Sequence, residues 1–377
     1  MPSKIKSQLP FFRYTFMTRP AIYIAITAHG FGHAVRACTV AAQIQQMNPE
    51  ILLILVTTAP HWLLESYIRG NFIYRTRTLD AGVIQADSLT MDRAMTLAKL
   101  KEIRRHQHRL IRAEAEYIQT NRVGLVLADV PPLAAPIAQK AGIPCWMMSN
   151  FGWDFIYRDW GGEFIEIADW MTEHYQQCDR LFRLPLHEPM SAFPQITDVG
   201  LTGGTPQNTE AELRAKFNLK NPPEKTILLT FGGLGLQQIP YNNIKDFPDW
   251  QFITFDRHAP DFPNLLKVAD PEYRPVDFMP YVGRVVSKPG YSTFAEALRL
   301  NVPIVSLTRE GFAESPFLIE GIQNHAHHQI VTPAEFFLGN WEFLRQPLQP
   351  PLQSELLATN GTESIAHAVL SFFDPSV

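Results

Sequence analysis

Residues 22–33 read Ile-Tyr-Ile-Ala-Ile-Thr-Ala-His-Gly-Phe-Gly-His, and this segment shows the class of fold most clearly. It begins with an apolar run of strand length, and a helical pattern of apolar residues follows over 33–47. A strand that is apolar along its whole length, rather than at alternate positions, is typical of a parallel sheet covered on both faces. The segment therefore predicts the first strand–loop–helix unit of an α/β domain.

The same rhythm of strand and helix recurs in two series. The first predicts strands at 51–57, 124–128 and 143–148 and helices at 92–120, 133–141 and 162–177; the second predicts strands at 226–231, 250–255, 285–287 and 302–307 and helices at 292–300 and 313–323. Residues 194–223 lose the rhythm and are rich in glycine and proline, which is typical of a domain boundary. We therefore predict two Rossmann-like α/β domains that face each other across a cleft.

The predicted organisation has five parts. They are a flexible tail at 1–16 (with Met17 as an alternative start), a first domain at 17–195, a linker region at 196–223, a second domain at 224–350, and a C-terminal helix at 351–377 that packs back toward the first domain.

Composition excludes several classes of protein. The 377 residues are 46 % apolar and 19 % charged, which indicates a globular chain rather than a disordered one. The net charge of −4 argues against nucleic-acid binding, and no apolar run is long enough to span a membrane. The predicted helix 92–120 is basic, but interspersed glutamates favour a solvated face over contact with anionic lipid. Three scattered cysteines form no disulfide framework, so we expect a cytoplasmic protein; the oligomeric state stays open.

The loop after the first strand carries two histidines, His29 and His33, around Gly30 and Gly32. A glycine turn that opens a helix points free backbone N–H groups and a partial positive charge at an anion. The same dipole disfavours an imidazolium, so His33 at the helix start is expected to be a neutral base. The alternative interpretation is that both histidines only pack or cap the helix.

Two further segments follow predicted strands of the first domain, where the strands of an open parallel sheet line a ligand crevice. Asp129 is placed to accept a hydrogen bond from a histidine and orient it; the alternative is a helix N-cap. Asn150, Trp153 and Asp154 lie in an aromatic segment that predicts an acceptor surface; the alternative is that these residues belong to the core.

The second domain contains two glycine loops that favour a nucleotide site. Small residues let the backbone approach a diphosphate, hydroxyls add donors, and a carboxylate on the following helix is suited to a ribose diol. Each loop alone would more often be a plain turn than a ligand site, and it is their occurrence together at strand ends that favours a nucleotide. The candidate donor-binding residues are Gly232, Gly233, Gly235, Lys288, Gly290, Tyr291, Ser292, Thr293, Glu296 and Glu314, with Glu314 expected to read sugar hydroxyls. No metal site is predicted, because the histidines at 325–328 have no acidic or cysteine partners nearby.

Three of these segments resemble known proteins. Residues 29–34, His-Gly-Phe-Gly-His-Ala, are similar to the acceptor-side loop of GT-B nucleotide-sugar glycosyltransferases, and residues 286–297 resemble their donor-binding motif. Within this class, residues 150–157 (Asn-Phe-Gly-Trp-Asp-Phe-Ile-Tyr) resemble the glycosyltransferase-like N-terminal domain of plant L-arabinokinases.

The resemblance implies a metal-independent, hexosyltransferase-like enzyme of GT-B fold. The donor, with UDP as the expected nucleotide, would bind the second domain, and a hydroxyl acceptor would bind the first. His33 would be the base and Asp129 its partner, and attack at the anomeric carbon would invert configuration in one step. Helix dipoles, backbone N–H groups and Lys288 would neutralise the departing diphosphate, so that no metal and no cofactor is expected.

Two other functions stay open on the same scaffold. One is a non-catalytic nucleotide-sugar-binding or regulatory protein, and the other is a nucleotide-sugar epimerase. A dehydrogenase is disfavoured, because neither glycine loop has the spacing of a dinucleotide site.

Overall fold

Strand β1 (Ala21–Ile26) is buried at every position and lies inside a parallel sheet. The structure is a computed structural model that describes residues 19–86, 89–232, 235–236 and 238–374; the predicted tail at 1–16 lies outside them. Within these residues the sheet has seven strands in the order β3-β2-β1-β4-β5-β6-β7. The other strands are β2 (Leu52–Val56), β3 (Phe72–Arg75), β4 (Leu125–Asp129), β5 (Cys145–Ser149), β6 (Arg180–Arg183) and β7 (Ile196–Asp198).

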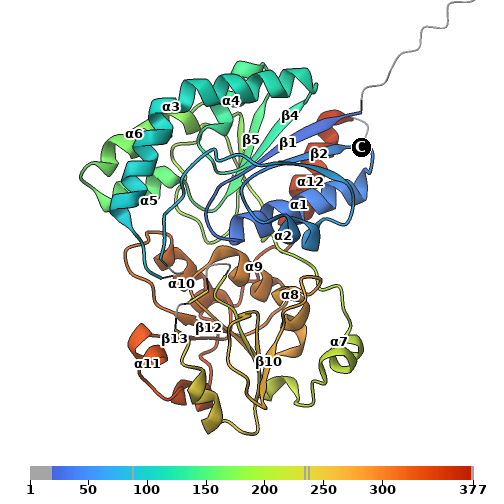
Figure 1. Ribbon diagram of the computed structural model, residues 1–377, viewed down its shortest axis with the longest axis vertical. Coiled ribbons are helices and arrows are strands. Elements are labelled where there is room, and N and C mark those ends of the chain that lie inside the picture. The colour runs from blue at the N-terminus through green and yellow to red at the C-terminus, as the bar shows by residue number, and fades with distance from the viewer. Residues whose placement is uncertain (1–18, 87–88, 233–234, 237, 375–377) are drawn as a thin grey trace, which may run out of the picture.

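A second parallel sheet follows in the later part of the chain (Figure 1). Its order is β10-β9-β8-β11-β12-β13, six strands within the described residues. They are β8 (Thr226–Leu229), β9 (Gln251–Thr254), β10 (Leu265–Lys267), β11 (Arg284–Ser287), β12 (Ile304–Leu307) and β13 (His328–Val331). Two Rossmann-like α/β domains, as predicted, are therefore confirmed.

The strand order of each sheet reverses at one point, and these points position the site. The reversal lies between β1 and β4 in the first sheet and between β8 and β11 in the second. In open α/β sheets, ligands bind outside the carboxyl ends of the strands at such a switch point. The register of the first sheet pairs Ile26 with Asp129, which brings the end of β4 next to the loop that carries the two histidines.

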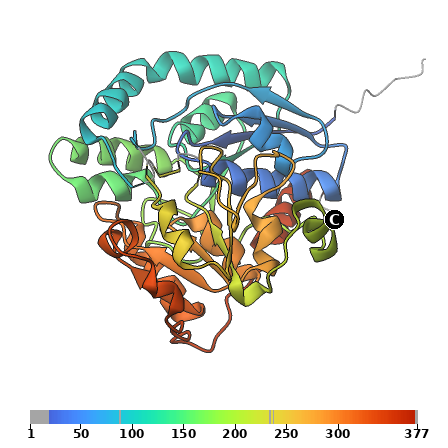
Figure 2. The same cartoon turned by 60° about the horizontal axis from the view of Figure 1, so that its bottom comes forward.

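Helices cover both faces of the first sheet because the side chains of β1 alternate between two cores. Ile22 and Ile24 pack with the apolar face of α1, whereas Tyr23 and Ala25 pack with residues of α3 and α4. Figure 2 shows α3 along the outer side of this domain. The helices are α1 (Gly32–Met47), α2 (His61–Tyr67), α3 (Arg93–Thr120), α4 (Ala134–Ala141), α5 (Trp153–Trp160), α6 (Phe164–Tyr175), α7 (Glu210–Phe217), α8 (Pro275–Phe278), α9 (Tyr291–Arg299), α10 (Ser315–His325), α11 (Pro333–Phe337) and α12 (Gly361–Phe373), with 3-10 turns η1 (Pro223–Lys225), η2 (Tyr241–Asp246), η3 (Met279–Tyr281) and η4 (Glu342–Arg345).

The boundary between the domains differs from the predicted linker of 196–223. Strand β7 falls inside that range but pairs with β6, so it belongs to the first sheet. Helix α7 also falls inside it, and Phe217 of this helix packs on Tyr273 and Phe278 of the second domain. The connection between the domains is therefore the short stretch from residue 199 to the start of α7.

The C-terminal helix returns to the first domain, where α12 packs against α1 (Figure 1). The chain thus crosses between the domains twice, and the two crossings run side by side. Leu201 donates its N–H to the carbonyl of Ala358 (2.7 Å), and Gly361 donates to the carbonyl of Leu201 (3.1 Å). A Cβ at position 361 would overlap the carbonyl oxygen of Gly200, so this close approach requires glycine.

Candidate active site

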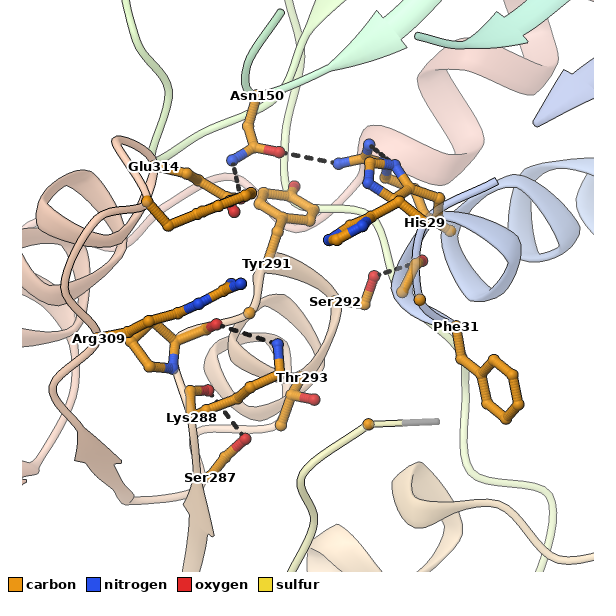
Figure 3. A pocket seen from close by; sticks show the side chains of 18 of the residues that line it. His29, Phe31, Asn150, Ser287, Lys288, Tyr291, Ser292, Thr293, Arg309 and Glu314 are labelled. Atoms are coloured by element: carbon orange, nitrogen blue, oxygen red, sulfur yellow. Dashed lines mark hydrogen bonds between the residues drawn. The ribbon is translucent and has the colours of Figure 1, made fainter. Parts of the chain in front are cut away.

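A pocket of about 110 Å³ lies where the switch points of the two sheets face each other (Figure 3). It brings together twelve of the residues that the sequence singled out. From the first domain they are His29, Gly30, Gly32, His33 and Asn150; from the second they are Gly232, Lys288, Gly290, Tyr291, Ser292, Thr293 and Glu314. Acceptor-side and donor-side candidates therefore share one pocket.

His33 and Asp129 form the hydrogen-bonded pair that the sequence predicted. His33 Nδ1 lies 2.8 Å from Asp129 Oδ1, and the Asp129 side chain is fully buried behind the imidazole. Burial raises the pKa of Asp129, but the charge of Arg36 and the hydrogen bonds from Arg36 and His33 outweigh burial and hold that pKa below its ordinary value. The carboxylate is thus ionised, and it accepts the Nδ1 proton. In a neutral imidazole with its proton on Nδ1, the other nitrogen, Nε2, carries no proton.

Arg36 is a residue of the pocket that was not predicted from the sequence. Its Nε donates to Asp129 Oδ2 (2.7 Å) and its Nη2 to Asp129 Oδ1 (2.5 Å). Arg36 follows His33 by three positions on α1, so that both side chains lie on one face of the helix. That spacing was the available signal, but a single arginine on a helix is more often solvent-exposed. Here only 2 % of it is exposed.

His29 supports the wall of the pocket as a neutral group. Burial lowers its pKa far below the ordinary value, and the nearby charges of His33, Arg309 and Lys288 lower it further. Its Nδ1 lies 3.1 Å from both the backbone nitrogen and the carbonyl oxygen of Val83, and its ring stacks on Phe312 with 6.0 Å between ring centres.

The N-terminus of α9 opens into the pocket beside Lys288. Gly290 at the N-cap provides no side-chain cap, so the first N–H groups of the helix point toward the pocket with the positive end of its dipole. Burial and the charge of Arg309 lower the pKa of Lys288 to about 7, against an opposing effect of Glu314. Ser292 reaches across to the first domain and donates to the carbonyl of Gly32 at 2.7 Å. This end of the pocket is suited to an anion.

Arg309 and Glu314 complete the wall of the pocket that the second domain forms. Arg309 follows the carboxyl end of β12, and Figure 3 shows its side chain between Lys288 and Glu314. The sequence reasoning missed Arg309, although its position just after a predicted strand was a usable signal. Glu314 Oε1 accepts a hydrogen bond from Asn150 Nδ2 at 2.7 Å, which links the two domains inside the pocket.

Besides Asp129, which lies behind His33, several predicted residues do not line the pocket. Trp153 is fully buried behind its wall and donates to Thr27 Oγ1 (3.0 Å), and Asp154 accepts from Thr172 of α6 (3.1 Å). Both belong to helix α5 and to the packing of the first domain, which was the alternative interpretation. Gly235 does not line the pocket, and Gly233 lies outside the described residues.

Glu296 does not line the pocket either, so the structure gives no support to its predicted role at a ribose. Its carboxylate accepts the N–H of Gly204 in the domain connection (3.0 Å) and does not reach the pocket. Residue 296 lies on the same face of α9 as residues 292 and 293, but about 5 Å further along the helix axis, so its carboxylate contacts the domain connection and not the pocket. Burial raises the pKa of Glu296 to about 7, although Gly204, Arg274 and Arg299 favour its ionised form.

This raised pKa predicts the effect of Glu296→Gln. The pKa of Glu296 is higher in the folded protein than in the unfolded chain, so the protonated carboxyl contributes to the free energy of unfolding below the unfolded pKa. This contribution is lost as the pH rises to about 7. Glutamine keeps the acceptor for Gly204 without a charge. We expect the variant to be more stable than the wild type by about 1–3 kcal/mol at pH 8, with a smaller difference at pH 5. Urea denaturation at both values checks this, and UDP affinity should not change. A variant that is less stable at pH 8 would contradict it.

Two further properties concern the described residues as a whole. None of their helices combines the length and apolar character needed to cross a membrane. Nor do three His, Cys, Asp or Glu side chains gather anywhere among them as ligands for a metal ion.

The class of protein is defined by the fold. The chain has the GT-B fold, as solved structures show over nearly its whole length. One is the glycosyltransferase of kitacinnamycin, with a TM-score of 0.59 and 16 % sequence identity; the match covers 94 % of this chain and 99 % of that chain. Another is CalG4, the calicheamicin glycosyltransferase, with a TM-score of 0.60 and 14 % identity; the match covers 96 % of each chain. A third is UDP-glucose:anthocyanidin 3-O-glucosyltransferase in complex with UDP, with a TM-score of 0.58 and 12 % identity; the match covers 94 % of this chain and 93 % of that chain. At these identities the likeness shows the fold alone.

One relative is more similar in sequence. L-arabinokinase of Arabidopsis thaliana is 30 % identical over 357 residues, which are 91 % of this chain and 33 % of that protein. The chain thus spans about a third of the length of this curated relative, and the predicted resemblance is confirmed. No protein-family model matches the chain.

Proposed function

We propose that the protein is an inverting, metal-independent glycosyltransferase that moves a sugar from a nucleoside-diphosphate sugar, with UDP as the expected nucleotide, to an acceptor hydroxyl. The observation that carries the proposal is the His33–Asp129 pair, 2.8 Å apart, in the same pocket as Lys288 and the N-terminus of α9. A base and an anion site on opposite walls are what a sugar transfer from a diphosphate needs. The name of the plant relative belongs to that whole protein and is not carried over.

The mechanism follows from the placement of these groups. The acceptor hydroxyl loses its proton to His33 Nε2 while its oxygen forms a bond to the anomeric carbon. The bond from that carbon to the diphosphate oxygen breaks, and its electron pair leaves with the diphosphate. Asp129 stabilises the imidazolium that forms, and attack opposite to the leaving group inverts configuration.

The donor side stabilises the departing charge. The proposal assigns the diphosphate to the first N–H groups of α9 and to the cations of Lys288 and Arg309. Gly232 and Gly290 let the backbone come close to it. Glu314 would bind a hydroxyl of the donor sugar through the carboxylate oxygen that Asn150 does not hold.

A transfer assay tests this proposal. The purified chain would be incubated with UDP-, GDP-, ADP- and TDP-glucose and with pooled hydroxyl acceptors, and diphosphate release and product mass would be measured. We expect release that depends on an acceptor, and a product of the opposite anomeric configuration. Binding of a donor without release would instead favour a nucleotide-sugar-binding protein, and conversion of the donor without any acceptor would favour an epimerase.

A further inference from the structure

The carboxylate of Asp129 has two partners, and this exceeds what orienting one histidine requires. Oδ1 lies 2.8 Å from His33 Nδ1 and also accepts from Arg36 Nη2 at 2.5 Å, while Oδ2 accepts from Arg36 Nε at 2.7 Å. A two-pronged contact of this kind fixes the plane of the carboxylate, which a lysine could not do.

Arg36 is itself held on its remaining sides. Its Nη1 donates to Asn150 Oδ1 (2.9 Å), its Nη2 reaches Ser149 Oγ (3.3 Å), and its guanidinium lies over the ring of Tyr291 at 5.1 Å. Asn150 in turn donates to Glu314 of the second domain, as Figure 3 shows. The guanidinium is therefore locked in place.

The charge of Arg36 acts directly on His33, because Arg36 Nη2 lies 3.1 Å from His33 Nδ1. Asp129 alone would strongly favour an imidazolium, whereas Arg36 offsets that attraction. The hydrogen bond to Asp129 requires a proton on Nδ1, so Arg36 repels a second proton without removing the first.

Few other titratable groups face His33. In the first domain these are His29, which burial keeps neutral, and Asp80, whose pKa burial raises. Lys288, Arg309 and Glu314 face it across the pocket. The side chains within hydrogen-bond distance of His33 Nδ1 include those of Asp129 and Arg36.

We propose that Arg36 is a positioning residue for sugar transfer: it fixes Asp129 in the orientation that accepts the Nδ1 proton of His33, and it balances the charge of Asp129 so that His33 keeps Nε2 unprotonated at neutral pH. The role in transfer rests on the proposed function, but the charge balance can be tested without turnover.

The test is an NMR titration of His33 in the full chain, assigned by loss of its signals in His33→Gln. In Arg36→Gln, we expect the midpoint of the His33 titration to move up by about one pH unit or more. Arg36→Lys keeps a cation, so the midpoint of its His33 titration should differ from that of the wild type by no more than about half of that shift. An Arg36→Gln midpoint that is unchanged or lower would overturn the proposal.

A second variant covers the case in which Arg36→Gln does not fold with an unpaired Asp129. The double variant Arg36→Gln/Asp129→Asn replaces the ion pair by two amides, so the local charge is unchanged. If the two charges balance, the His33 midpoint stays close to that of the wild type. A fall of the midpoint by about one pH unit would show that Arg36 does not offset the effect of Asp129 on His33 in the wild type, and would overturn the proposal.

Kinetics test the link to transfer. At neutral pH we expect Arg36→Gln to lower kcat by about tenfold, to move the acid limb of the kcat profile to higher pH, and to leave UDP affinity unchanged. A merely structural role would lower activity equally at all pH values, and that result would overturn the role in transfer. Absence of turnover in the wild type would contradict the proposed function, while the NMR result would still decide the charge balance.

Discussion

His33→Ala is expected to lower kcat by about 10²–10⁴-fold, which is the usual contribution of a positioned general base. The fold should survive, because Asp129 keeps its two-pronged contact with Arg36 after the imidazole is removed. UDP affinity should stay within about twofold of the wild-type value, since His33 acts in the transition state and not on the donor. Steady-state transfer and calorimetric UDP binding on the same preparation check both parts.

His29→Ala is the matched control for this prediction. Both histidines line the pocket, but His29 Nδ1 is engaged by the backbone of Val83 and the His29 ring packs against Phe312. We expect its effect on kcat to be smaller than that of His33→Ala by about tenfold or more. Equal losses in the two variants would contradict the assignment of the base.

Lys288→Met is expected to lower the affinity for UDP by about 10–100-fold at pH 6, because a charge-assisted contact to the diphosphate is lost. The effect should depend on pH, since the pKa of Lys288 in the free protein is about 7. A bound diphosphate favours the charged lysine and raises its pKa, so binding takes up a proton above pH 7. The wild-type advantage over Lys288→Met should therefore shrink by up to about tenfold for each pH unit above 7.

Lys288→Arg is the control for this pH dependence. Arginine keeps the charge but does not titrate in the accessible range. Because a terminal phosphate itself gains charge near pH 6, each variant is compared with the wild type at the same pH by calorimetry. If the wild-type protein and Lys288→Arg show the same pH dependence of UDP affinity, Lys288 does not titrate in this range. If the wild-type protein and Lys288→Met bind UDP equally well, Lys288 does not contact the donor.

The pocket residues that lie just after the carboxyl ends of strands were predicted from the sequence. His33, Asp129, Asn150 and Lys288 each follow an apolar run, and parallel strands bring such positions to one edge of a sheet. This topological rule needs no knowledge of packing. The alternation of strands and helices predicted two α/β domains, and the resemblance of residues 29–34 and 286–297 to GT-B enzymes implied the GT-B arrangement.

Residues on helices were harder to place, because their direction depends on packing. Glu296 belongs to a predicted donor motif, yet it faces the domain connection and accepts from Gly204. Trp153 and Asp154 were read as a surface at a strand end, but the apolar face of α5 buries the indole against Thr27. Arg36 carried no local sign that a buried carboxylate would hold it.

Short edge strands were also missed. Strand β7 is three residues long, Ile196–Asp198, and it has no apolar run because neither Ile196 nor Asp198 is buried. Its pairing with β6 comes from tertiary contact and not from a pattern in the sequence.

The most direct test of the account is a thermal-stability screen of the full chain with UDP, GDP, ADP and TDP. A ligand that binds only the folded state stabilises it by about 2.7 kcal/mol at a hundredfold excess over Kd. We predict that one nucleoside diphosphate, expected to be UDP, stabilises the wild type and Glu296→Gln alike, and that Lys288→Met loses most of this effect. No stabilisation by any diphosphate, or an equal effect in Lys288→Met, would contradict a donor site at the N-terminus of α9.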